Sequence, residues 1–556
     1  MPLIPLFLML AITAAGCLPA SSQDQRPNIL YIFTDDLSYR GISAYPQAYP
    51  YVDTPNIDRL AETGIRFDHA YIGAKCSPSR IGQRCGRFQY ATFVEGQADP
   101  HLATGNWFKD LRANGYYTGF IGKWHNGKGA ESHGHGVSWD WSVVWDHGEK
   151  GHEPGKQASG GYYYDQYVMY HGADPVELGG YSTDRYNELT LDFITERGAE
   201  PGKPWFFWLC YAGVHSPYTP PDRHTGLYLD MEPTPIPADI FGPRPNMPSH
   251  MQNFTRWTPG KDGMPMRKGK TLDFFVKQQM QAARAIDDGV GLFLQRLEET
   301  GQLENTIIVF TSDQGYVWGH HGLKGKIWPY ADAIKAPLLI ANPKRFPAGT
   351  VCKSPVNGMD MVRTFHAWSN TQPSLRLHGR DITPLCREPQ SSAVHAEWNK
   401  TPTMMCYTYN RYEPIEMAQK LKNGAWDSFA WTGAEGEKDD KKGKNGKKGK
   451  ENDEKATNNE SSTVAASNGT GKDGDPLDHP NWFSLHNGTY KYIRYCHPNR
   501  IEELYDAEGD PDELNNLAVN PEHEETLREF RAALVERLTA CDGEAFVDHI
   551  PEPLQR

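Results

Sequence analysis

The segment CSPSR places a cysteine, Cys76, at the start of a pattern that ends in Arg80. Pro78 suits the first turn of a helix, so Cys76 should lie at or just before a helix N-terminus, where backbone N–H groups favour negative charge. Arg80 would return to the same face of that helix. By itself the pattern leaves four interpretations open: half of a disulfide, a buried small apolar residue, a redox thiol, or the precursor of a more reactive group.

Further chemically capable side chains follow four apolar runs of the chain. The runs, at 28–34, 116–122, 204–213 and 305–312, are typical of strands buried on both faces of a parallel sheet. In open α/β sheets, ligands bind beyond the carboxyl ends of the strands. We therefore expect one site, formed by the residues that follow the runs: Asp35 and Asp36, then Lys123, Trp124 and His125, then Val214 and His215, and then Asp313 and Gln314.

Six motifs in a fixed order, together with a segment near the C-terminus, resemble those of one enzyme family. CSPSR (76–80) resembles the C-x-P-x-R signature of the formylglycine-dependent type I sulfatases, in the alkaline phosphatase superfamily. GYYTGFIGKWH (115–125) is similar to their second signature. NILYIFTDD, HSP (215–217), FTSDQG and HGLKGKIWPYADAIKAPLL follow in the order and spacing of the family, and LYDAEGDPDELNNLA (504–518) resembles its common ending. The resemblance spans roughly residues 27–345 and resumes near residue 480.

The resemblance implies chemistry that an unmodified cysteine cannot perform. In this family a maturation enzyme oxidises the motif cysteine, here Cys76, to Cα-formylglycine (3-oxoalanine). Its hydrated aldehyde carries two hydroxyl groups. One hydroxyl attacks sulfur and releases the alcohol, and the second then expels sulfate and restores the aldehyde. The expected reaction is hydrolysis of a sulfuric ester.

The resemblance also assigns roles to the residues of the expected site. A single calcium ion would be held by oxygen ligands and would contact the modified residue 76, the ligands being Asp35, Asp36, Cys76, Asp313 and Gln314. Lys123 and Lys326 would hold sulfate oxygens, and Arg80 would support the hydrated aldehyde. His125 would assist removal of the proton from the second hydroxyl, and His215 would protonate the leaving oxygen.

Several positions depart from the family pattern or leave alternatives open. Cys85 stands where threonine is common, and Gln314 replaces the more frequent Asn or His. Lys324, His320 and His321 flank Lys326 and compete with it for the cationic role. The segment SHGHG (132–136) could be a second metal site, although its glycines favour histidines on a surface loop.

The substrate and the rival functions rest on weaker signals. Aromatic rings at a pocket rim would suit sugar faces and favour a sulfated carbohydrate, although we expect most of the aromatic residues near the motifs to pack in the core. They are Trp107, Trp124, Trp139, Trp141, Trp145, Trp318, Trp328 and Tyr330. Polysaccharide, oligosaccharide and small aryl sulfate all stay open as substrates. The rival functions are a phosphonate monoester or phosphodiester hydrolase of the same superfamily and a non-catalytic sulfoglycan-binding protein.

Composition and the chain ends indicate the compartment and the partners. The formal net charge of −13 argues against nucleic acid as a partner. Residues 1–20 resemble a signal peptide, so we expect an exported protein, periplasmic or secreted, or one tethered by a lipid on Cys17. No later segment is apolar for long enough to span a bilayer. The nine cysteines contain no C-x-x-C pair, which disfavours zinc and dithiol chemistry.

The alternation of strand-like and helix-like segments predicts an α/β fold, with a large, mostly parallel sheet sandwiched by helices and a smaller C-terminal α+β subdomain. We expect a catalytic domain at 27–395 and a C-terminal subdomain at 396–556. Within the latter, the charged segment at about 434–475 lacks apolar residues and should be disordered. A helix is expected near 521–539, with an apolar face formed by Leu527, Phe530, Leu534, Val535 and Leu538.

Overall fold

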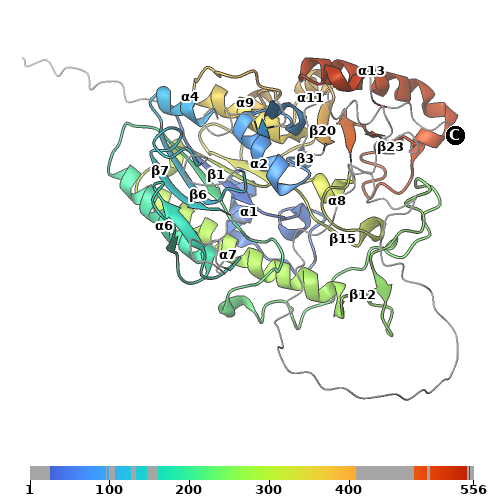
Figure 1. Ribbon diagram of the computed structural model, residues 1–556, viewed down its shortest axis with the longest axis horizontal. Helices are drawn as coiled ribbons and strands as arrows, with labels where there is room; N and C mark the ends of the chain where they lie inside the picture. Colours follow the sequence, from blue (N-terminus) through green and yellow to red (C-terminus); the bar gives the residue numbers. More distant parts are fainter. Residues whose placement is uncertain are drawn as a thin grey trace, which may run out of the picture.

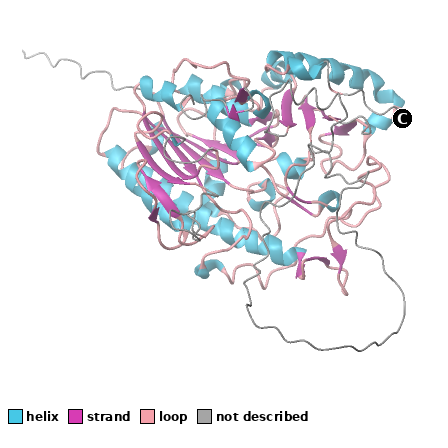
Figure 2. Cartoon of the chain, viewed as in Figure 1, coloured by secondary structure: helices cyan, strands magenta, loops and turns pink. Residues whose placement is uncertain are grey.

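The centre of the molecule is a mixed sheet of ten strands (Figures 1 and 2). The structure is a computed structural model, and it describes residues 26–94, 97–98, 107–126, 133–146, 161–408, 481–496, 501–547 and 550. In spatial order the strands are β18 (Thr350–Cys352), β2 (Gly64–Phe67), β17 (Leu338–Ala341), β14 (Thr306–Ser312), β1 (Asn28–Thr34), β10 (Trp205–Cys210), β6 (Tyr117–Lys123), β7 (Trp141–Trp145), β8 (Tyr167–Tyr170) and β9 (Val176–Glu177). The five strands from β14 to β7 are parallel, so their carboxyl ends share one edge.

Helices cover both faces of this sheet. On one face, Leu30 and Ile32 of β1 pack in a core that includes α1 (Pro55–Glu62), α6 (Ser182–Gly198) and α7 (Leu272–Glu299). On the other face, Ile29 and Tyr31 pack in a core that includes α4 (Phe108–Ala113), α9 (Gly358–Trp368) and α10 (Thr383–Arg387). Because alternate residues of a strand point to opposite faces, a strand buried on both must be apolar throughout. The predicted α/β class is confirmed.

The four apolar runs that were expected to be strands form β1, β6, β10 and β14. The third strand ends at Cys210, earlier than expected. Beyond it the chain still follows the segment after β1, because Asp35 N–H donates to the Gly213 carbonyl at 2.9 Å and Val214 N–H donates to the Asp35 carbonyl at 2.7 Å. These two bonds fix the segment that leads to His215 beside the end of β1.

A smaller antiparallel sheet forms the C-terminal subdomain, as expected. Its strands are β20 (Thr403–Tyr407), β21 (Trp482–His486), β22 (Tyr490–Tyr495) and β23 (Glu503–Asp506). Helix α13 (Glu524–Ala540) covers it through Leu527, Phe530, Leu534 and Leu538. The prediction for Val535 is wrong, because this side chain is 45% exposed. The same core includes Tyr90 and Met359 of the larger domain, so the two parts pack together.

The remaining elements connect and close these layers. They are α2 (Cys76–Cys85), α8 (Ala331–Ile334), α11 (Ser392–Asn399) and α14 (Glu544–Val547), with the short strands β3 (Ala70–Tyr71), β4 (Phe93–Val94), β5 (Gln97–Ala98), β11 (Thr258–Pro259), β12 (Pro265–Arg267), β13 (Lys270–Thr271), β15 (Val317–Trp318), β16 (Lys324–Gly325) and β19 (Val356–Asn357). None of the helices described is long and apolar enough to cross a membrane. The predicted leader at 1–20, with Cys17, and the charged segment at 434–475 lie outside the described residues. The domain boundary at 395/396 stays a prediction.

Candidate active site

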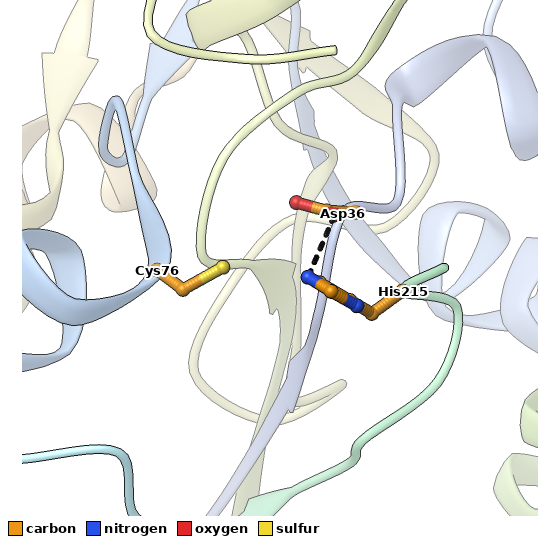
Figure 3. Close-up of side chains that lie close together, drawn as sticks. All are labelled: Asp36, Cys76 and His215. Carbon is orange, nitrogen blue, oxygen red and sulfur yellow. Dashed lines mark ion pairs between the residues drawn. The ribbon is translucent and has the colours of Figure 1, made fainter. Parts of the chain in front are cut away.

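Side chains from separate segments meet at the carboxyl edge of the central strands. Ligand-capable atoms of Asp35, Asp36, Cys76 and Asp313 all lie within 4.8 Å of one another. His215 forms a second such group with Asp36 and Cys76, and Figure 3 shows these three side chains pointing toward one another. The parallel ladder brings Thr34 beside Ser312, so Asp35 and Asp313 must emerge side by side. The predicted convergence on one place is therefore what the structure shows.

Cys76 is the first residue of α2, and Pro78 lies in its first turn as expected. The thiol is 2% exposed. It donates to Asp35 Oδ1 at 3.1 Å, while Lys326 Nζ lies 2.7 Å and Gln314 Nε2 lies 3.4 Å from the sulfur. All eight described cysteines are free thiols, so Cys76 is not half of a disulfide here. Burial, followed by the charge of Asp313, raises the pKa of the Cys76 thiol.

The acidic part of the site contains three carboxylates and one amide. Asp36 adopts a left-handed backbone conformation with φ of 61°, which turns its N–H toward Asp313 Oδ1 at 3.1 Å. Gln314 donates through Nε2 to Asp36 Oδ1. The side chains of Asp35, Asp36 and Asp313 are at most 2% exposed. Burial and the nearby charge of Asp35 raise the pKa of Asp313 to about 8. The carboxylates are thus crowded more closely than their charges favour.

Three cationic side chains face these carboxylates. Lys123, at the end of β6, pairs with Asp35 Oδ2, and Lys326 Nζ contacts both carboxylate oxygens of Asp36 at 2.8 and 2.9 Å. Arg80 donates to Asp313 Oδ2 at 3.2 Å and to the Lys123 carbonyl at 3.0 Å. Burial opposes ionisation of Asp35, but Lys123 and then His215 hold its pKa well below the usual range. Buried charges of both signs are therefore paired within the site.

The site opens on the side of His215 and Lys326, whose side chains are 17% and 18% exposed. His215 Nε2 lies 3.7 Å from Asp36 Oδ2, and its Nδ1 lies 2.8 Å from the Ser216 carbonyl. Burial and the charge of Lys326 lower the pKa of His215 to about 4. A ligand that reaches the buried groups would meet this histidine and this lysine first.

His125 lies just beyond β6 and adopts a positive φ of 59°. The next residue, Asn126, donates through Nδ2 to the His125 carbonyl at 2.8 Å and to the carbonyl and hydroxyl of Ser77 at 3.0 Å. These bonds join the segment after β6 to the first turn of α2. His125 therefore follows the strand that carries Lys123 and neighbours the helix that carries Cys76.

The residues that compete with Lys326 have other partners. His320 pairs with Asp332 at 3.4 Å, and His321 Nδ1 lies 3.2 Å from Asp239. Lys324 Nζ lies over the ring of Trp318, 5.4 Å from its centre. Among these candidates, Lys326 is the one that contacts both Asp36 and Cys76.

Two residues of the site carried no motif in the sequence. Tyr162 donates to Asp35 Oδ2 at 2.8 Å, accepts from Lys123 at 2.8 Å and stacks on His215 with ring centres 4.8 Å apart. Gln279 of α7 donates to the Asp36 carbonyl at 3.0 Å. The only sequence signal for Tyr162 was the aromatic run GGYYYDQ, which lies far from any expected strand end. Gln279 stands in the buried stripe of a helix, where an amide needs a polar partner.

The expected core packing of most of the aromatic residues is confirmed, whereas the expected surface position of His133 is wrong. Seven of the eight aromatic residues proposed for a pocket rim are buried in the core, at most 5% exposed, and Trp141 is half-buried against the first core. His133 of the SHGHG segment is 1% exposed and lies 3.1 Å from Asp146, so it is a buried, paired histidine. Large rings remove so much apolar area from water that they favour the core whatever their place in the sequence.

The family of this chain follows from comparison with known proteins. The sulfatase family model matches residues 27–371, which is more than half of the chain. The chain is a member of the sulfatase family. This sulfatase is 27% identical to an N-acetylglucosamine-6-O-sulfatase of Bacteroides thetaiotaomicron over 470 residues. The aligned region covers 74% of this chain and 79% of that protein. It is an enzyme that hydrolyses sulfate esters.

Solved structures share the fold of this sulfatase at lower identity. One, of a protein in complex with its substrate D-glucosamine-2-N,6-O-disulfate, is 21% identical with a TM-score of 0.68, covering 93% of this chain and 99% of that one. Another is a phosphonate monoester hydrolase of Agrobacterium radiobacter, 17% identical with a TM-score of 0.59, covering 92% and 96% of the two chains. At these identities the likeness concerns the fold alone.

Proposed function

We propose that this sulfatase releases sulfate from a sulfated carbohydrate, using residue 76 in its formylglycine form and one bound calcium ion. The observation that carries the proposal is the setting of Cys76. Its buried sulfur is contacted by Asp35, Lys326 and Gln314, at the point where three carboxylates and three cations meet. A structural cysteine needs no such surroundings, whereas a nucleophile acting on an anionic ester needs all of them.

The donor set fits a hard divalent cation. Asp35, Asp36 and Asp313 offer carboxylate oxygens, and the Gln314 amide, whose Nε2 donates to Asp36, could turn its oxygen toward a cation held by these carboxylates by exchanging the places of its nitrogen and oxygen. Oxygen ligands of this kind suit calcium, and the crowding that raises the pKa of Asp313 to about 8 would be relieved by a positive ion. When bound, calcium supplies a positive charge that stabilises sulfate oxygens and lowers the pKa of a nearby hydroxyl.

The thiol of Cys76 is poorly suited to attack in its unmodified state. Burial and the charge of Asp313 raise its pKa, and the thiolate is the nucleophilic form of cysteine. Oxidation to formylglycine would replace the sulfur by a hydrated aldehyde, which supplies a hydroxyl nucleophile. The proposal therefore requires a maturation enzyme as a partner of this chain.

We propose roles for the other side chains from the family resemblance and from their contacts. Lys123 and Lys326 would hold sulfate oxygens, because each already faces the carboxylates beside residue 76. Arg80 would help to orient residue 76, since its guanidinium donates hydrogen bonds to Asp313 and to the Lys123 carbonyl within the site. His215, on the open side, would donate a proton to the leaving oxygen, and the negative charge of the bound ester would favour the imidazolium form. His125 would accept a proton from the hydrate.

The proposed substrate class draws on the relatives. The core position of the aromatic side chains removes the sequence argument for a sugar-binding rim. One relative is named an N-acetylglucosamine-6-O-sulfatase, and a structure with this fold holds an amino sugar disulfate as its substrate. We therefore propose sulfated amino sugars as the substrates to test first. Secretion or export, with or without a lipid on Cys17, is proposed from the leader alone.

Two measurements test the proposal together. Mass spectrometry of the peptide containing residue 76, from protein produced with a maturation enzyme, should show a product about 18 Da lighter than the thiol. The same protein should release inorganic sulfate from N-acetylglucosamine 6-sulfate, and Cys76→Ala should not. An unmodified thiol in active protein would overturn the formylglycine assignment.

A comparison of kcat/KM between sulfate and phosphorus esters distinguishes the proposed sulfatase activity from the rival phosphonate monoester or phosphodiester hydrolase activity. We expect kcat/KM for 4-nitrophenyl sulfate to exceed that for 4-nitrophenyl phosphate, because a single cation neutralises a singly charged ester better than a doubly charged one, and to exceed that for 4-nitrophenyl phenylphosphonate, the substrate type of the rival. A higher kcat/KM for the phosphonate would favour the rival.

A further inference from the structure

A second cationic group lies beside the open side of the site. Lys324 is on β16, two residues before Lys326. Its ammonium lies over three rings, 5.2 Å from the centre of Phe275, 5.4 Å from Trp318 and 5.7 Å from Tyr218. Such ring faces attract a cation but supply no counter-ion and accept no conventional hydrogen bond. The rings therefore hold the ammonium in place and leave it able to bind an anion.

The charges around Lys324 are almost all positive. Burial, then Arg267, Lys268 and Arg256, lower the pKa of Lys324 to about 7, and Asp36 is the carboxylate that opposes them. Among the residues that the structure describes, neither Lys324 nor Arg267 makes an ion pair. The Nε atom of Arg267 is buried without a hydrogen-bond partner, while its Nη1 donates to the Arg256 carbonyl at 3.1 Å. Placing the charges of Lys324 and Arg267 near each other with no ion pair to either costs free energy, which an anionic ligand would offset.

This cationic cluster is continuous with the active site. The segment that carries His215 continues to Tyr218, and the segment that carries Lys326 begins with Lys324. Tyr218 bonds Tyr316 through their hydroxyls at 2.6 Å. Burial, followed by the charge of Asp36, raises the pKa of Tyr316 to about 12, while Lys326 of the site and Arg267 of the cluster oppose this rise. Figure 1 shows β12, which carries Arg267, and β15, which pairs with β16, on the same side of the molecule. The cluster thus borders the side from which a substrate enters.

We propose that Lys324, assisted by Arg267, forms a second anion subsite that binds a sulfate or carboxylate group carried elsewhere on the same substrate. The inference rests on the proposed function, since it takes the ester under attack to lie at residue 76. It narrows the substrate to sugars with at least two anionic groups. A sugar with one sulfate would fill the active site and leave Lys324 without a counter-ion.

The test compares two substrates that differ in the number of anionic groups. 4-Nitrophenyl sulfate has one, and D-glucosamine-2-N,6-O-disulfate has two. The ratio of kcat/KM for the disulfate to that for the aryl sulfate should fall about tenfold in Lys324→Met, because a charge-assisted contact is lost for one substrate only. Arg267→Met should lower the same ratio less, and Lys324→Arg should restore most of it.

Matched controls separate this effect from damage to the fold. Lys344→Met removes an exposed lysine that pairs with Glu304, and it should leave the ratio and both activities unchanged. Thermal unfolding of each variant shows whether the protein is folded. A ratio that stays within twofold of the wild type in both Lys324→Met and Arg267→Met would overturn the proposal.

A binding measurement tests the anion subsite independently of the proposed catalytic function. If the matured wild type released sulfate from neither compound, the proposed function would fail. Calorimetric binding of D-glucosamine-2-N,6-O-disulfate to Cys76→Ala, with and without Lys324→Met, would then decide the subsite alone. Binding that is about tenfold weaker in the Cys76→Ala/Lys324→Met double variant than in Cys76→Ala would support the anion subsite, and equal affinity would overturn it.

Discussion

Nζ of Lys326 lies 2.7 Å from Sγ of Cys76, although the two residues are 250 positions apart in the chain. The same ammonium contacts both oxygens of Asp36. Lys326 is therefore the cation that joins the proposed nucleophile to the acidic part of the site, on the side where the site opens.

Replacing this lysine should affect catalysis more than folding. Lys326→Ala should lower kcat/KM for 4-nitrophenyl sulfate by about 10²–10³, because a preorganised positive charge facing developing negative charge is lost. Lys326→Arg should retain part of the activity. Steady-state kinetics on matured protein measures the change, with the exposed Lys344→Met as the control. Near wild-type kinetics in Lys326→Ala would remove this residue from the proposed mechanism.

A divalent cation should stabilise the fold through the crowded carboxylates. Added calcium should raise the melting temperature of the chelator-treated protein, by on the order of 5 °C at saturating concentration. Asp313→Asn removes one of the three carboxylates, whose crowding raises the pKa of Asp313 to about 8. The variant should melt no lower than the wild type without calcium and should lose most of the calcium-dependent gain. An equal gain in both proteins would place the ion elsewhere.

The position before Lys123 should not tolerate a side chain. Gly122 has φ of 102°, and a Cβ there would lie 1.9 Å from the Cys210 carbonyl oxygen of the neighbouring strand. Gly122→Ala should destabilise the protein by about 2 kcal/mol or more and reduce activity, since it displaces Lys123. Gly226→Ala is the matched control, because a Cβ there meets no atom within 4 Å. Urea unfolding measures both, and equal stabilities would contradict the prediction.

Stability should fall in acid because of buried histidines in the small sheet and beside it. Burial lowers the pKa of His486 well below 6.5, and burial followed by Lys335 lowers the pKa of His69 to about 3. Unfolded histidines take up protons near pH 6.5, so the unfolded state binds more protons below that pH. Each such residue should therefore cost the folded state up to about 1.4 kcal/mol per pH unit as the pH falls from 6.5. The effect is absent above that range.

Urea unfolding at pH 7.5, 6.0 and 5.0 checks this dependence. His486→Asn keeps an acceptor for the Gly488 N–H, which bonds His486 Nδ1 at 2.9 Å, and removes the titrating ring. Its unfolding free energy should decline less steeply between pH 6.0 and 5.0 than that of the wild type. The same decline in both proteins would show that other groups dominate.

The parts of the site that follow strands could be predicted, and the parts on loops could not. Asp35, Lys123 and Asp313 stand directly after or at the end of apolar runs, and the geometry of a parallel sheet then requires them to meet. Tyr162 reaches Asp35 and Lys123 from a segment with no strand or helix pattern, so nothing in its local sequence indicates its partner. Its position depends on tertiary packing.

Side-chain burial was likewise only partly predictable. Every residue of β1 is buried as its composition indicates, but Val535 is exposed although it is apolar and lies in a helix. Leu534 next to it occupies the buried stripe, and neighbours in a helix point about 100° apart. His133 was expected at the surface because glycines flank it, but Asp146 provides a buried partner that no local pattern reveals.

The 2% exposure of Cys76 has a consequence for when the proposed oxidation could take place. The maturation enzyme that we propose would need access to Cys76, which is buried in the folded protein. Gln314 and Lys326, which enclose the sulfur, are synthesised 238 and 250 residues after it. If residue 76 is oxidised as proposed, the oxidation would have to occur after residue 76 leaves the ribosome and before these late segments dock, so slower elongation between them should increase the fraction of converted protein.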